Sequence, residues 1–460
     1  MRKNIIFITT DHQRSDTIHM IQNKKEVTPN LNKLSNEGIE FENVYTTCPL
    51  CVPARTSLAT GIFPTKTKVV INDLKHAPVE TKDYKTMHEF LYEAGYKVNH
   101  FGMQHITLQP SLKERLQFEN FITDDDYEII CKENNLPLFG TEEDRVNVIE
   151  RHGDLYEKRK YTGTHVSIFE HEKELYRDQF YTNKLFEYLE KEDFKQPTAI
   201  FLNLWCPHPP LRVLKDYINK FENPTLPENI NKPAFNEPES RRKGIAAQLA
   251  EDHNIEHWKE VWKAYLGMTN YADDIIGKLI NYLKEKNIYD NTVIVFTADH
   301  GDHLGQHKMF QKMEMYDQAT KVPLIMKIPD VENRKIKEYV SHLDVLPTIL
   351  SILGIDLKDY KFDGENLKDK ILNNKKLEDK FVYSQYSGNQ VSVGDLRRTI
   401  IGEGFKYTWD NENGEELFDL INDKLEMNNL SNIEKYQEIK SNLKTKLKNF
   451  LIDKKDWIQI

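Results

Sequence analysis

The chain has 460 residues, with 63 Lys and Arg against 73 Asp and Glu, a formal net charge of −10 and 39% hydrophobic residues. Its 22 Phe and 22 Tyr, and charges of both signs spread along the chain, exclude wholesale disorder. The acidic balance and the lack of a basic stripe argue against nucleic acid as a partner. No apolar run reaches the roughly 20 residues that a membrane-spanning helix needs, so no membrane contact is expected.

The N-terminal segment and the number of cysteines suggest in which cellular compartment the protein resides. The segment MRKNIIFITTDHQRSD combines basic residues with a short apolar run, but charge returns at Asp11 without a small-residue cleavage site. This pattern does not match a signal peptide. Four cysteines in a chain of this length do not form a disulfide framework. We therefore expect a cytoplasmic protein.

Strands and helices are predicted to alternate in the first hundred residues. The helix that starts with Thr-Pro ends at a glycine, as a capped helix does. The predicted elements are a strand at 5–8, a helix at 28–38, a β-rich segment at 41–47, helices at 51–61 and 87–94, and a strand at 97–101. From about 107 to 195 the chain is charged and aromatic without clear periodicity, and we expect helices and loops that cover one face.

The alternation resumes in the second half. Strands are predicted at 198–205, 292–301 and 322–329, and helices at 258–286 and 342–354. This alternation predicts an α/β fold with a doubly wound, mainly parallel sheet flanked by helices.

The sequence changes character beyond about residue 365. Short strands are expected at 382–386 and 399–409, a turn at 411–416 and a last amphipathic helix at 434–450. We therefore predict a main domain over 1–365 and a small C-terminal α+β subdomain with an antiparallel sheet over 366–460.

Polar clusters follow three predicted strands. Asp11 comes after the first strand, and His208 comes after the strand at 198–205. The pair Asp299 and His300 comes after 292–298, the apolar part of the strand predicted at 292–301. In open α/β sheets, ligands bind beyond the carboxyl ends of the strands. Carboxylates and imidazoles from two strand ends could hold one divalent cation. The alternative is that these side chains merely cap helices and turns.

A second candidate site surrounds Cys51. Pro53 suits the first turn of a helix, so Cys51 is expected at a helix N-terminus, where free amides favour an anion. Arg55 adds a cation that can bind an anion in bidentate fashion. Two other interpretations of Cys51 remain open. Cys48 and Cys51 form a CxxC pair that could be redox-active or half a zinc site, and Cys51 could be a buried structural cysteine.

The string CVPARTSLATG resembles the signature of the sulfatase family, whose cysteine is oxidised to Cα-formylglycine after synthesis. The resemblance extends to NIIFITTDHQRSD, TVIVFTADHGDHLGQHKMFQK, HLDVLPTIL and ELFDLINDKLEMNNLS, in the family's order. It implies an alkaline-phosphatase-like fold. It also implies a formylglycine-generating maturase as a partner for Cys51.

The resemblance implies a metal site and a mechanism. Asp11, Asp299, His300 and the residue at position 51 would bind one divalent metal, most simply calcium, with manganese and magnesium left open. The aldehyde at position 51 would be hydrated to a geminal diol. One hydroxyl would attack sulfur, and the alcohol would leave with a proton from a histidine or lysine. The second hydroxyl would then lose a proton and expel sulfate as the aldehyde re-forms.

The other site residues also follow from the resemblance. Arg55 would steady the formylglycine, and Asn72 would contact the substrate anion. His105 matches a histidine of the Gly-Lys-x-His segment, and His208 and Lys312 match residues that contact the sulfate ester. The expected function is hydrolysis of a sulfate ester, on a sugar or a small organic molecule.

Two positions depart from the family pattern. Met103 stands where the family has a lysine, and His12 stands where many members have a second metal aspartate. We therefore leave His12 out of the ligand set. The missing cation leaves room for a phosphonate monoester or phosphodiester hydrolase on the same scaffold. A non-catalytic binding protein is a further alternative.

Overall fold

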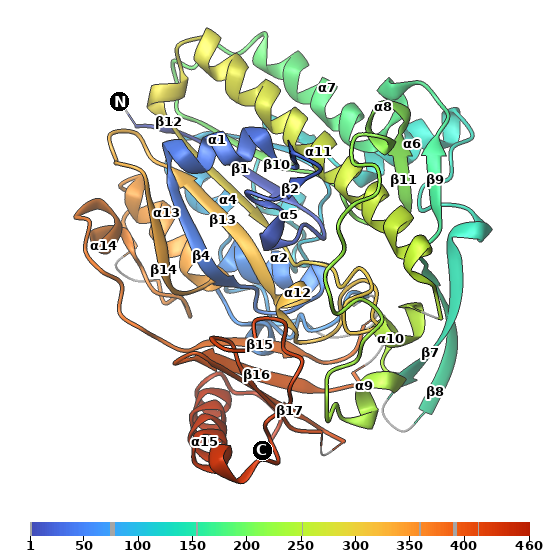
Figure 1. Ribbon diagram of the computed structural model, residues 1–460. Helices are drawn as coiled ribbons and strands as arrows, with labels where there is room; N and C mark the ends of the chain where they lie inside the picture. The colour runs from blue at the N-terminus through green and yellow to red at the C-terminus, as the bar shows by residue number, and fades with distance from the viewer. Residues whose placement is uncertain are drawn as a thin grey trace.

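The computed structural model describes residues 2–73, 79–152, 155–250, 252–357, 360–389, 393–412 and 414–460. Its centre is an eight-stranded sheet with the order β14-β4-β13-β12-β1-β10-β5-β6 (Figure 1). In that order the strands are Arg334–Ser341, Ile39–Tyr45, Lys321–Lys327, Thr292–Ala298, Asn4–Thr10, Thr198–Asn203, Lys97–Gly102 and Asn120–Ile122. Only β13 runs antiparallel to its neighbours, so the mainly parallel sheet is confirmed.

The strands alternate their side chains between two cores. In β1, Ile5 and Phe7 belong to one buried cluster and Ile6 and Ile8 to the other. This is the two-residue period of a strand that is buried on both faces. Helices therefore have to cover both faces, as the doubly wound fold requires.

One face is covered by α2 (Cys51–Thr60), α4 (Met87–Glu93) and α13 (Val345–Ile352). The other face is covered by α1 (Pro29–Glu37), α7 (Arg177–Leu189) and α11 (Ile255–Glu285). In Figure 1, α7 and α11 lie along the upper side of the sheet. These helices confirm the five helices predicted at 28–38, 51–61, 87–94, 258–286 and 342–354.

A four-stranded antiparallel sheet follows near the C-terminus and lies at the bottom of Figure 1. Its strands are β15 (Val382–Tyr386), β16 (Arg397–Gly402), β17 (Phe405–Asp410) and β18 (Glu416–Asp419), and α15 (Gln437–Asp453) packs on them. The stretch predicted as a strand at 399–409 is two strands, because Glu403 and Gly404 both have positive φ and form a two-residue hairpin turn. The turn predicted at 411–416 includes residue 413, which lies outside the described residues.

The expectation for 107–195 is wrong in part. This region holds α6 (Asp124–Glu133) and α7, but also β6, which extends the main sheet, and a hairpin of β7 (Arg145–His152) and β8 (Leu155–Thr162). Most of β8 is exposed, so its sequence LYEKRKYT lacks the apolar alternation that marks a half-buried strand. Within the described ranges, no helix is long and apolar enough to cross a membrane.

The remaining elements are short. The strands are β2 (Ile21–Gln22), β3 (Lys25–Glu26), β9 (Val166–Phe169) and β11 (Leu211–Leu214). The helices are α3 (Pro64–Thr67), α5 (Leu112–Arg115), α8 (Lys215–Ile218), α9 (Glu239–Lys243), α10 (Ile245–Ala250), α12 (Asp317–Thr320) and α14 (Lys368–Leu372). Single turns of 3₁₀ helix lie at Ser15–Thr17, Glu142–Asp144, Lys173–Leu175, Tyr289–Asn291, His342–Asp344 and Glu434–Tyr436.

Candidate active site

The two predicted aspartates meet at the carboxyl ends of adjacent strands. Strands β1 and β12 pair in parallel, with Thr10 opposite Ala298, so Asp11 and Asp299 leave the sheet side by side. Both side chains are fully buried. The Asp299 Oδ1 atom accepts hydrogen bonds from the backbone N–H of His300 at 2.9 Å and of His12 at 3.3 Å. The sheet edge thus holds two carboxylates close together, as the sequence predicts.

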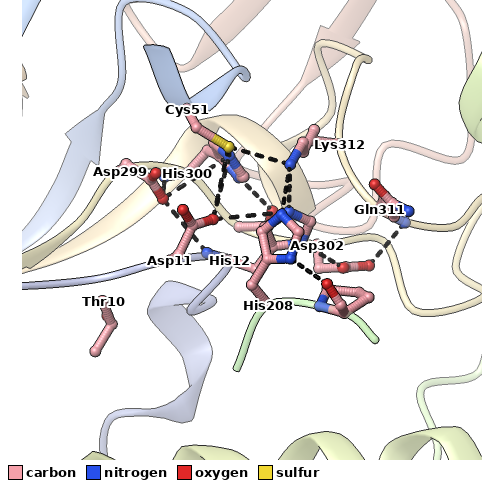
Figure 2. A network of polar contacts seen from close by, with 12 residues as sticks. Thr10, Asp11, His12, Cys51, His208, Asp299, His300, Asp302, Gln311 and Lys312 are labelled. Carbon is pink, nitrogen blue, oxygen red and sulfur yellow. Dashed lines mark hydrogen bonds and ion pairs between the residues drawn. The ribbon is translucent and has the colours of Figure 1, made fainter. Parts of the chain in front are cut away.

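Helix α2 brings Cys51 to the same point. Cys51 is its first residue, and the helix ends at Gly61, whose φ of 68° is the left-handed conformation that suits glycine. The Cys51 Sγ atom lies 3.2 Å from His300 Nε2 and 3.7 Å from Asp11 Oδ1. Figure 2 shows the sulfur facing these side chains and Lys312. All four cysteines are free thiols, so the CxxC pair forms no disulfide.

Arg55, one helical turn after Cys51, binds the carboxylates. Its Nε donates to Asp299 Oδ2 at 2.8 Å, and its Nη2 lies 3.4 Å from Asp11 Oδ2. Its Nη1 donates to Thr9 Oγ1 at 3.0 Å and its Nη2 to the Thr10 carbonyl at 3.4 Å. Every guanidinium nitrogen of Arg55 therefore has an oxygen partner.

Two imidazoles of the site have their protonation fixed by carbonyl groups. His300 Nδ1 lies 3.0 Å from the Gly301 carbonyl, and His208 Nδ1 contacts the Pro209 carbonyl. A carbonyl only accepts, so Nδ1 carries the proton in each ring and Nε2 presents a lone pair. Burial lowers the pKa of His300 to about 4 and that of His208 well below its usual value. Both rings are therefore neutral near pH 7.

His12 lies in the middle of the site. Its ring is fully buried, Nδ1 lies 2.7 Å from Asp302 Oδ2, and Nε2 lies 2.6 Å from Lys312 Nζ and 3.8 Å from Asp11 Oδ1. Its φ of 64° is in the left-handed region, which non-glycine residues rarely adopt. The Tyr265 hydroxyl holds this conformation by donating to the His12 carbonyl at 2.9 Å. Sequence reasoning left His12 out, and the structure places it in the cluster.

Lys312 completes the centre of the site. Its Nζ lies 3.2 Å from Cys51 Sγ and 3.3 Å from His208 Nε2, in addition to its contact with His12 (Figure 2). Burial lowers the pKa of Lys312, but Cys51 and Asp11 outweigh it, so its pKa is raised and the ammonium stays charged. A single cation is thus surrounded by nitrogen and sulfur atoms from three other elements.

Asn72 and His105 lie at the edge of this cluster, and both are partly buried. The Asn72 side chain accepts from the backbone N–H of Val52 at 3.2 Å and donates to Asn389 Oδ1 at 2.9 Å. Asn72 therefore caps the N-terminus of α2, a role that its sequence position does not reveal. Burial lowers the pKa of His105 to about 4, while Asp124 opposes this shift.

The donor set fits a divalent cation. One ligand atom each from Asp11, His12, Cys51 and His300 lie within 4.8 Å of one another. Burial and the neighbouring Asp299 carboxylate raise the pKa of Asp11, and one guanidinium, that of Arg55, serves both carboxylates. An added cation would stabilise the charged form of Asp11. Asp299 borders this tight cluster, with its oxygens engaged by Arg55 and by backbone N–H groups.

The fold and the site define a class of protein. The sulfatase family model matches residues 3–355, and a model described as N-sulphoglucosamine sulphohydrolase, C-terminal, matches residues 305–453. The chain belongs to the sulfatase family of the alkaline phosphatase superfamily and is an enzyme of the sulfuric ester hydrolase class.

Individual relatives agree with this assignment. The chain is 26% identical over 467 residues to the arylsulfatase of Clostridium perfringens, covering 95% of this chain and 92% of the relative. It is 28% identical to the choline-sulfatase of Rhizobium meliloti, covering 88% of this chain and 77% of the relative.

Solved structures share the fold. BT4656 in complex with its substrate D-glucosamine-2-N,6-O-disulfate is 20% identical with a TM-score of 0.75, and 99% of each chain is covered. The phosphonate monoester hydrolase of Agrobacterium radiobacter is 20% identical with a TM-score of 0.77, covering 98% of this chain and 96% of that chain. At this identity the two structures bear on the fold alone, and they confirm the alkaline-phosphatase-like fold.

Proposed function

We propose that this protein hydrolyses a sulfate ester through a formylglycine made from Cys51, with the help of one divalent metal. The observation that carries the proposal is the position of Cys51. Its sulfur lies at the start of α2, within 3.7 Å of Asp11, His300 and Lys312. A helix N-terminus, a buried ammonium and a site for a cation all favour negative charge on the transferring group.

The state of the thiol supports the modification. Burial raises the pKa of the Cys51 thiol, and the Asp11 carboxylate adds to the shift. The thiolate is the nucleophilic form of cysteine, so this thiol is a poor nucleophile near pH 7. A hydrated aldehyde at the same position would not depend on forming a thiolate. A formylglycine-generating maturase is therefore the proposed partner. The proposed compartment is the cytoplasm, because all four cysteines are free thiols.

The neighbouring residues have distinct proposed roles. Asp11, Asp299, His300 and residue 51 would hold the metal, which when bound polarises the oxygens of the ester group. Arg55 holds the two carboxylates in place. Because these carboxylates, together with Thr9 and the Thr10 carbonyl, engage every nitrogen of the guanidinium, its help to residue 51 is through positioning.

Lys312 and His208 would act on the substrate. The Lys312 ammonium would bind the sulfate oxygens and is the charged proton carrier next to residue 51. His208, neutral and partly buried, would accept a hydrogen bond at Nε2 and orient Lys312. Asn72 would contact the substrate anion, and His105 would be a further catalytic residue.

The relatives support a substrate class for this proposal. The named activities of the relatives include an arylsulfatase and a choline-sulfatase, and one structural neighbour binds a disulfated glucosamine. We propose a sulfate ester of a sugar or a small organic molecule. A phosphonate monoester or phosphodiester is the second candidate, because Met103 is buried where the family has a lysine, and one anion-binding cation is missing.

Two measurements test the proposal. Peptide mass spectrometry across residue 51 of the natively expressed protein should find the mass of formylglycine in place of cysteine. Specific rates on an aryl sulfate should exceed those on an aryl phosphonate and an aryl phosphodiester. Unmodified Cys51 in a fully active protein would refute the modification, and a strong preference for the phosphorus substrates would favour the second candidate. No turnover of any of the three would favour the non-catalytic alternative.

A further inference from the structure

The donor set on one side of the site differs from that of a calcium site. Calcium is bound by oxygen atoms, whereas imidazole nitrogen suits first-row transition metals such as zinc, iron and nickel. The tight cluster offers one carboxylate oxygen from Asp11 but two imidazole nitrogens, from His12 and His300. Whether His12 takes part therefore decides which metal the protein prefers.

The contacts of His12 fix which nitrogen faces the site. The Asp302 carboxylate accepts and does not donate when charged, so His12 Nδ1 carries the proton at 2.7 Å from it. The Lys312 ammonium donates and has no lone pair, so its approach to 2.6 Å requires a lone pair on His12 Nε2. The Lys312 contact alone assigns this tautomer, and the Asp302 contact agrees with it. His12 thus presents an unprotonated nitrogen to the cluster.

Asp302 is itself held in position. Its Oδ1 accepts from the backbone N–H groups of Leu304 at 3.0 Å and Gln311 at 2.9 Å, and its side chain is fully buried. A carboxylate that accepts from the far nitrogen of an imidazole orients the ring and raises its basicity as a metal ligand. His300 and His208 have carbonyl partners instead. Of these three rings, His12 has the strongest such support.

We propose that His12 Nε2 is a ligand of the metal, that Asp302 orients it, and that the site therefore selects a first-row transition metal over Ca²⁺, with Mn²⁺ as the paramagnetic probe of that preference. The inference rests on the proposed metal-dependent function and specifies its metal. Lys312 and a metal cannot use the same lone pair of His12. Metal binding would therefore release the Lys312 ammonium toward the substrate anion.

Pulsed electron paramagnetic resonance of the Mn²⁺-loaded protein counts the nitrogen ligands directly. The protein is stripped with a chelator and reloaded with Mn²⁺, and the couplings to ligand nitrogen are recorded. The wild type should show two imidazole nitrogens and His12→Asp only one. His171→Asp, the same change at an exposed histidine, should keep both. A single nitrogen in the wild type, or two in His12→Asp, would overturn the proposal.

Calorimetric titration of the stripped protein tests the selectivity. The wild type should bind Mn²⁺ at least about tenfold more tightly than Ca²⁺, and His12→Asp should reverse that order. Asp302→Asn should keep both nitrogens but weaken Mn²⁺ binding by about 10- to 100-fold. Tighter binding of Ca²⁺ by the wild type, or an unchanged affinity in Asp302→Asn, would count against it. If His12→Asp fails to fold, the number of nitrogen ligands in the wild type and the Mn²⁺ affinity of Asp302→Asn still test the proposal.

Neither measurement uses turnover as its readout. A protein that binds Mn²⁺ through two imidazoles but hydrolyses no sulfate ester would refute the proposed function and keep this inference. A sulfatase that binds Ca²⁺ through one imidazole would support the proposed function and refute this inference.

Discussion

The two cationic side chains of the site have opposite surroundings. Within the part of the chain that the structure describes, the hydrogen-bond partners of Arg55 are oxygen atoms, and two of them are the carboxylates of Asp11 and Asp299. Lys312 contacts the ring nitrogens of His12 and His208 and the sulfur of Cys51. On the Arg55 side the cation is paired with carboxylates, whereas the direct contacts of the Lys312 cation are groups without a formal charge. We infer that the first side maintains the site and the second responds to ligands.

Residue 51 lies between the two sides, and its removal should have the largest effect. Cys51→Ala should lower kcat on an aryl sulfate by at least about 10³-fold, because the nucleophile itself is lost. Its unfolding midpoint should stay close to that of the wild type, since the thiol forms no ion pair with Arg55. Steady-state kinetics and urea unfolding measure the two effects.

Cys48→Ala is the matched control, because Cys48 is also a buried free thiol close in sequence. It should retain most of the activity. Equal losses in the two variants would mean that packing, not chemistry, explains the effect of Cys51→Ala.

Arg55→Ala should mainly reduce stability. It leaves two fully buried carboxylates without their cation, and breaking a buried ion pair from one side typically costs about 3–5 kcal/mol. The free energy of unfolding from urea titration should fall by that amount in the metal-free protein. Added metal should restore part of it, since a bound cation compensates the same carboxylates. A stability equal to that of the wild type would refute the structural role of the Arg55 side.

Lys312→Ala should mainly reduce activity and affect stability less, the reverse of Arg55→Ala. Loss of one charged group that stabilises the transition state typically lowers kcat/KM by about 10²- to 10³-fold. The stability loss should be smaller, about 1–2 kcal/mol, because the neighbours left behind are neutral hydrogen-bonding groups. Lys308→Ala is the control, since the Lys308 ammonium pairs with the exposed Asp252. If Lys312→Ala destabilises the protein as much as Arg55→Ala, the contrast between the two sides is wrong.

The sequence predicted the Arg55 side better than the Lys312 side. Asp11 and Asp299 follow strands of buried apolar residues, so their meeting at one sheet edge follows from the strand pattern alone. The role of His12 depends on Asp302, which is 290 positions away and reaches it only through the fold. The dense run Asp-His-Gly-Asp-His contains Asp302 and was the available signal, but it does not say which histidine each carboxylate orients.

In region 107–195, parts of the fold could likewise not be predicted from the local sequence. Strand β6 has three residues and β8 is charged and exposed, so neither carries a hydrophobic period that could be detected. Their strand pairing is set by partners distant in sequence or by the adjoining hairpin strand. The boundary near residue 365 stays a prediction, as do the roles assigned to the site residues.

Substitutions of Asn72 should have the smallest effects on stability and activity. They test whether this residue, at the edge of the site, caps helix α2 or contacts the substrate. Asn72→Ala removes the acceptor for the Val52 N–H and should cost about 0.5–2 kcal/mol of stability. Asn72→Asp keeps that acceptor and adds a negative charge at the N-terminus of α2, which favours the helix. Its stability should therefore stay near that of the wild type. The same charge would repel an anionic substrate, so KM for the sulfate ester should rise by about tenfold if Asn72 contacts it. An unchanged KM in Asn72→Asp would show that Asn72 serves only as a cap.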